Sequence, residues 1–171
     1  MRVRLAYLLL CLLMLASCGQ RPQSVRHLHE PQQEDTVLEA QLRFNLHMAD
    51  AADKLCIEMV RQDSSLQYAL DEFGFWYAKS VAVDGEMLQN GQEVELHLVL
   101  SELRGGVIAD EQGVFVVGTS ELPVAINRAL RLMSVGEEMR IIAPWYAAYG
   151  IEGTTLVAPY TNLRILMNVI Q

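Results

Sequence analysis

The stretch LRLMSVGEE at residues 130–138 lies between two regions whose apolar residues repeat with different periods. Before it, apolar residues starting at Leu122 and Ile126 recur at spacings of three and four, which predicts a short helix over 122–133. After it, apolar and polar residues alternate over 138–143, which predicts a strand with one buried face. The stretch itself therefore reads as a helix end, a glycine turn and the start of a strand.

The alternating pattern also occurs on either side of this unit. Residues 93–101 and 162–170 alternate in the same way, and residues 75–78 and 114–117 are short aromatic or apolar runs. Turn dipeptides separate these segments: Asp84-Gly85, Asn90-Gly91 and Gly105-Gly106. Several short strands with one short helix predict an α+β domain over 73–171, in which an antiparallel sheet curves around the helix.

A long amphipathic helix is predicted ahead of this domain. Apolar residues recur at helical spacing from Thr36 to Arg61, within an N-terminal helical segment assigned to 36–70. Cys56 falls on the apolar stripe, which favours a packed thiol over a reactive one. An exposed stripe of this length needs a partner, so the helix either packs on the following domain or forms a homodimer with a second copy.

The N-terminus has the pattern of an export signal. Two arginines precede the apolar run 5–15, which is short for a membrane span and typical of a signal peptide over 1–17. Leu15-Ala16-Ser17-Cys18 resembles a bacterial lipobox, so we expect lipidation at Cys18, with a flexible tether over 18–35. The alternative is an ordinary signal peptide with a chance cysteine. The expected location is the cell envelope, anchored by lipid to a bacterial membrane and facing the periplasm.

The composition excludes several classes of protein. The chain has 171 residues, of which 51% are hydrophobic, and a net charge of −8, so neither full-length disorder nor nucleic-acid binding through basic residues is expected. With three cysteines, a disulfide-stapled fold is not expected. Phosphate-binding loops, nucleophile elbows and zinc motifs are absent from the sequence, and we expect no cofactor and no metal.

One ordered set of motifs resembles a known family. The 130–138 stretch, the Ala148-Tyr149-Gly150 turn, the spacing of fourteen from Gly136 to Gly150 and the closing strand at 162–166 resemble the FKBP-type peptidyl-prolyl isomerases. The resemblance extends over residues 74–170, and with the lipobox it is most similar to the lipid-anchored, gliding-motility-associated branch. It implies an FKBP-like sheet around one short helix.

The resemblance implies catalysis of cis/trans rotation about X-Pro bonds in exported polypeptides. An apolar pocket favours the twisted amide of the transition state, which is less polar than the planar amide. By motif, Tyr149 and Asp110 match the family's catalytic tyrosine and aspartate. The positions that match substrate-binding walls are Leu98, Phe115, Leu122, Pro123, Ile126 and Ile165.

The sequence also departs from the family pattern. Ile126 stands where the family has a tryptophan, and Leu98, Ile165 and Ala109 stand at aromatic positions. Pro123 stands where a backbone N–H holds a substrate carbonyl, and proline has no N–H. These departures favour low turnover and keep open an alternative function, a chaperone or assembly scaffold with weak or lost isomerase activity.

Overall fold

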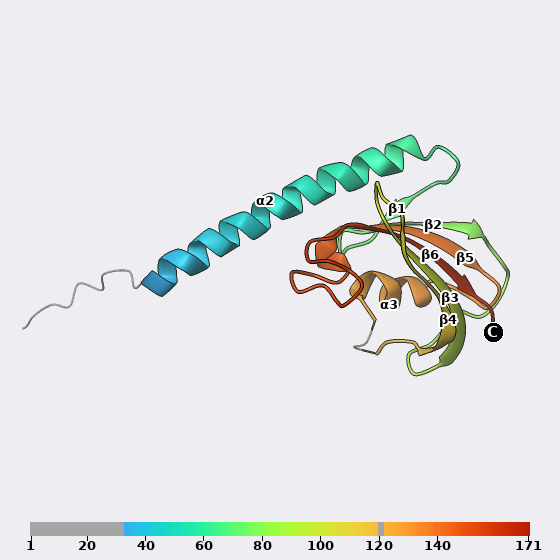
Figure 1. The fold of residues 1–171 in the computed structure, drawn as a ribbon. Helices are drawn as coiled ribbons and strands as arrows, with labels where there is room; N and C mark the ends of the chain where they lie inside the picture. Colours follow the sequence, from blue (N-terminus) through green and yellow to red (C-terminus); the bar gives the residue numbers. More distant parts are fainter. Residues whose placement is uncertain (1–32, 120–121) are drawn as a thin grey trace, which may run out of the picture. The chain divides into compact units, whose positions relative to one another are not determined.

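The computed structural model describes residues 33–119 and 122–171 of the chain (Figure 1). The predicted signal peptide, Cys18 and nearly all of the tether lie outside these residues and stay predictions. The chain divides into two compact units, Met1–Leu38 and Glu39–Gln171, and the contacts described below belong to the second. No helix in the described ranges combines the length and apolar character that a membrane span requires.

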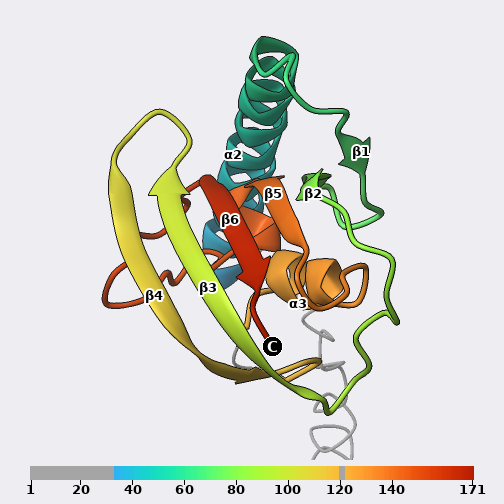
Figure 2. The same cartoon turned by 90° about the vertical axis from the view of Figure 1, so that its right-hand side faces the viewer.

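The predicted antiparallel sheet is confirmed. It has six strands in the order β1-β2-β5-β6-β3-β4, and every neighbouring pair is antiparallel. The strands are β1 (Ala69–Leu70), β2 (Trp76–Val81), β3 (Glu93–Glu102), β4 (Val107–Val116), β5 (Glu138–Ala143) and β6 (Leu163–Val169). Figure 2 shows the long β3–β4 pair bending around the short helix α3 (Val124–Leu130).

The main core lies between the sheet and α3. Strand alternation directs every second side chain of β3, β5 and β6 to the same face, and the register places Leu98 opposite Met167 and Ile141 opposite Ile165. Helix α3 contributes Ala125, Ile126, Ala129 and Leu130, all fully buried. The alternating pattern in the sequence is thus the pattern of burial in the fold.

Helix α2 (Gln33–Gln62) packs on the sheet through the C-terminal part of its apolar stripe. Cys56 is 1% exposed and packs with Leu103 and Ile142, which follows Ile141 on β5 and so points to the sheet face away from α3. Burial, with a smaller contribution from Asp53, raises the pKa of the Cys56 thiol to about 12. The thiol is therefore protonated and enclosed, as the sequence pattern predicts.

Two tyrosines connect α2 to the segment that follows β5. This segment begins with the 3-10 helix η1 (Trp145–Ala147). The Tyr146 hydroxyl donates to the Asp53 carboxylate, and the Tyr160 hydroxyl donates to Asn45 Oδ1 at 2.7 Å. Asn45 and Asp53 of α2 thereby hold both ends of the segment that carries Tyr149.

Glu137 is buried, although two adjacent acidic residues such as Glu137-Glu138 are ordinarily exposed to solvent. The Glu137 side chain is 2% exposed, and Lys79 Nζ lies 2.7 Å from its Oε2. The backbone N–H groups of Val83 and Ser134 also donate to this carboxylate, at 3.1 and 2.9 Å. Burial alone would raise the pKa of Glu137, but these hydrogen bonds and Lys79 outweigh it and hold the pKa below its usual value.

Candidate functional site

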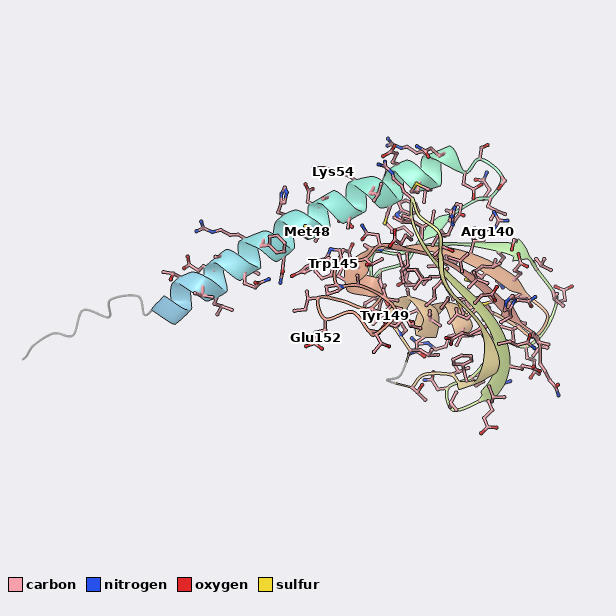
Figure 3. The ribbon with its side chains drawn as sticks, in the orientation of Figure 1. Met48, Lys54, Arg140, Trp145, Tyr149 and Glu152 are labelled. Atoms are coloured by element: carbon pink, nitrogen blue, oxygen red, sulfur yellow. The ribbon has the colours of Figure 1, made fainter. Side chains whose placement is uncertain are left out.

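A cavity of about 270 Å³ opens between the β3–β4 pair and the loop that follows Tyr149. Figure 3 shows Tyr149 on the same side of the sheet as α3. The residues that line the cavity are Leu98, Leu100, Ala109, Glu111, Phe115, Leu122, Tyr149, Thr154, Thr155, Leu156 and Val157. Its walls are mainly aliphatic, which suits an apolar ligand more than a charged one.

Half of the residues proposed from the sequence line this cavity. Leu98 and Phe115 come from the β3–β4 pair, Leu122 precedes α3, and Tyr149 follows η1. Four elements separated in the sequence therefore meet at one site. Their roles in binding or catalysis stay predictions, but the fold places them where such roles are physically feasible.

Three of the other proposed residues belong to the interior rather than to the cavity lining. Ile126 and Ile165 are fully buried in the core between α3 and the sheet. Pro123 is buried and precedes the first residue of α3, with φ −56° and ψ 157°. Because proline has no N–H, the start of α3 lacks the donor that the resemblance implies at this position.

The structure places Asp110 outside the cavity and Glu111 inside it. On β4, Ala109 and Glu111 share the face toward the cavity, so the intervening Asp110 points to the opposite face. There Asp110 Oδ1 lies 2.7 Å from Nε2 of His97, and its side chain is 63% exposed. The motif match identifies the correct strand, but because side chains alternate along β4, Glu111 rather than Asp110 lines the cavity.

Tyr149 carries an unused donor. Among the residues that the structure describes, no group accepts a hydrogen bond from its hydroxyl. Burial, and secondarily the Glu111 carboxylate, raise the pKa of Tyr149 above its ordinary value. The phenol is therefore protonated at neutral pH and can donate to a carbonyl oxygen entering the cavity.

The far wall is a tight loop that sequence reasoning did not identify as part of the site. The Thr154 N–H donates to the Val157 carbonyl at 2.7 Å, and Thr154 Oγ1 accepts from the N–H of Val157 at 3.0 Å. Gly153, at φ +66°, makes the turn into this loop. The available signal was the pair Gly150 and Gly153, which marks a turn immediately after Tyr149.

The cavity has no metal-binding character. Within 33–119 and 122–171, no group of three or more His, Cys, Asp or Glu side chains is arranged to hold a metal ion. The chemistry available at the site is hydrogen bonding by Tyr149, apolar contact and the negative charge of Glu111.

The comparisons identify the domain. Residues 85–164 match the family model of the FKBP-type peptidyl-prolyl cis-trans isomerases. A peptidyl-prolyl cis-trans isomerase from Pseudomonas syringae pv. tomato str. DC3000 has a similar fold, with 19% identity, a TM-score of 0.62 and coverage of 73% of this chain and 92% of its own. AtFKBP13 also shares 19% identity, with a TM-score of 0.56 and coverage of 61% and 98%. No curated protein matches the chain.

Proposed function

Because residues 85–164 form an FKBP-type peptidyl-prolyl cis-trans isomerase domain, we propose that this chain accelerates rotation about X-Pro bonds. Rotation without a catalyst faces a barrier of about 18–20 kcal/mol, because it breaks the amide resonance. The aliphatic cavity favours the less polar twisted amide, and Tyr149 donates to a carbonyl of the bound peptide. The free Tyr149 hydroxyl in an aliphatic cavity is the observation that carries this proposal.

Tyr149 and Asp110 are expected to respond differently to substitution. Tyr149→Phe should lower kcat/KM on a proline peptide by about threefold to tenfold, since one hydrogen bond contributes about 0.5–1.5 kcal/mol. Asp110→Asn should change it by less than about twofold, because this carboxylate faces away from the cavity. The measurement is a proline-peptide isomerisation assay on the detergent-solubilised full chain.

The outcome of this assay also tests the proposal itself. A folded wild-type chain that isomerises the peptide no faster than the uncatalysed rate would exclude the enzyme function. A larger loss for Asp110→Asn than for Tyr149→Phe would contradict the assignment of the cavity as the active site.

A chaperone or assembly scaffold is the second candidate. The observation that favours it is the aliphatic wall, because Leu98 and Ala109 offer less aromatic surface to a proline ring than the family pattern. A scaffold function predicts suppression of aggregation of an unfolded client that is equal for the wild type and Tyr149→Phe. If Tyr149→Phe lost both isomerase activity and the ability to suppress aggregation, the scaffold function would be contradicted.

We place this activity at a membrane surface of the cell envelope, on exported proteins. The support is the signal pattern over 1–17 and the lipobox that ends at Cys18. Cys18→Ser should move the chain from the membrane fraction to the soluble fraction of the envelope. Equal membrane association of both forms would remove the lipid anchor from the proposal.

We also propose that α2 pairs with a second copy of the chain. Leu42 and Leu46 are four residues apart on one helix face and are 57% and 61% exposed. This part of the stripe is left uncovered by the contacts that bury Cys56. Sedimentation of Leu42→Glu/Leu46→Glu should give a monomer where the wild type gives a dimer, and a monomeric wild type would refute the pairing.

A further inference from the structure

Glu111 brings a charge into an otherwise uncharged cavity. Of the eleven described residues that line it, Glu111 is the one with an ionisable carboxylate, and none is basic. Its position is fixed by the sheet, because Glu111 on β4 lies opposite Leu98 on β3 in the register. Glu111 is exposed, and the neighbouring cavity residue on β4 is the small Ala109.

This carboxylate also lacks a basic partner. Two other acidic groups of the domain do have a nearby nitrogen partner: Glu137 lies beside Lys79 Nζ, and Asp110 lies beside the imidazole of His97. Within the described part of the chain, Glu111 is in no ion pair with Lys, Arg or His. Glu111 and Tyr149 both line the cavity, and the Glu111 carboxylate contributes, after burial, to the raised pKa of Tyr149.

We propose that Glu111 makes the site selective for X-Pro segments that carry Lys or Arg next to the proline. This inference rests on the proposed isomerase function and names its substrate class. A cation held by Glu111 forms a charge-assisted hydrogen bond, and because Glu111 is an exposed residue of the cavity lining, salt screens this attraction. The net charge of −8 on the chain also favours the approach of basic peptides over acidic ones.

The test compares peptides that differ at the residue before or after the proline. The detergent-solubilised full chain is assayed with Lys, Leu or Glu at that position, at low and high ionic strength. For the wild type we expect kcat/KM in the order Lys, Leu, Glu, with about a tenfold difference between Lys and Glu at low salt that shrinks at high salt. Glu111→Gln should bring the ratio of kcat/KM for the Lys peptide to that for the Glu peptide close to one. Glu111→Lys should reverse the order of the three peptides.

Glu93→Gln is the matched control. Glu93 is an exposed residue at the start of β3, opposite Val116, and it does not line the cavity. The substitution changes the net charge by the same amount as Glu111→Gln, so the Lys-to-Glu ratio should stay at the wild-type value. An equal loss of selectivity in both variants would overturn the local role of Glu111 and assign the effect to net charge.

Failure of this inference is distinguishable from failure of the proposed function. Catalysis of all three peptides at equal rates by the wild type would overturn the selectivity and leave the isomerase intact. Absence of catalysis on every peptide would overturn the isomerase. In that case, binding titrations with fluorescent versions of the same peptides decide the selectivity, and equal affinities for the Lys and Glu peptides would overturn it.

Discussion

Glu137→Ala is expected to lower the free energy of unfolding by about 3 kcal/mol, because it removes a buried carboxylate that accepts two backbone hydrogen bonds and pairs with the half-buried Lys79. Lys79 would lose the carboxylate at 2.7 Å, and the N–H groups of Val83 and Ser134 would lose their acceptor. These contacts connect the turn before β5 to Lys79 on β2 and to Val83 in the segment that follows β2. The measurement is chemical denaturation at pH 7.

The pH dependence gives a second readout. The folded-state pKa of Glu137 is below its usual value, so its stabilisation is fully present above the unfolded-state pKa, about 4.3. The stabilisation is lost as the pH falls through the lower folded-state pKa. The difference in unfolding free energy between the wild type and Glu137→Ala should therefore narrow below about pH 4.

The control for this experiment is Glu86→Ala. Glu86 is exposed, so its removal should change the unfolding free energy by no more than about 0.5 kcal/mol. If Glu137→Ala were as stable as Glu86→Ala, the buried carboxylate would have no role in holding the turn.

Gly153→Ala should abolish most of the isomerase activity of a chain that still folds. At φ +66° an added Cβ is strained, a cost of roughly 1–2 kcal/mol. This Cβ would also overlap the Val157 carbonyl oxygen and lie 2.8 Å from the Pro159 nitrogen, so the loop must move. Since Thr154 to Val157 form the far cavity wall, we expect kcat/KM to fall by about tenfold or more.

Gly91→Ala separates backbone strain from the loss of the cavity. Gly91 has φ +82°, and a Cβ there meets no atom within 4 Å. Both variants should unfold at a lower temperature than the wild type, but Gly91→Ala should keep wild-type kcat/KM when assayed well below that temperature. Equal activities for the two variants would show that the 153–157 loop is not needed for the reaction.

The sequence predicts the central strands well because their two faces differ in burial. The predicted strand over 138–143 coincides with β5, and 93–101 differs from β3 by one residue, because the alternating apolar residues there pack in the main core with α3. β4 was harder to predict. Its apolar run at 114–117 marks only one end, since the polar part 110–112 lies near the sheet edge and keeps no apolar alternation.

The candidate site shows the same limit at the level of single side chains. The motif match identifies the correct strand, β4. The pairing register of that strand determines that Glu111, and not Asp110, faces the cavity. The burial of Glu137 depends on Lys79 and Val83, which are more than fifty residues away in the sequence. No local pattern around residue 137 contains that information.

β4 is an outer strand of the sheet, so one row of its backbone N–H and C=O groups has no neighbouring strand. Such an edge can recruit the edge of another molecule and start aggregation. Two adjacent carboxylates, Asp110 and Glu111, lie on opposite faces of this strand, and a second copy aligned along it would bring like charges together. The two acidic residues on this edge therefore disfavour sheet-to-sheet association between copies of this protein.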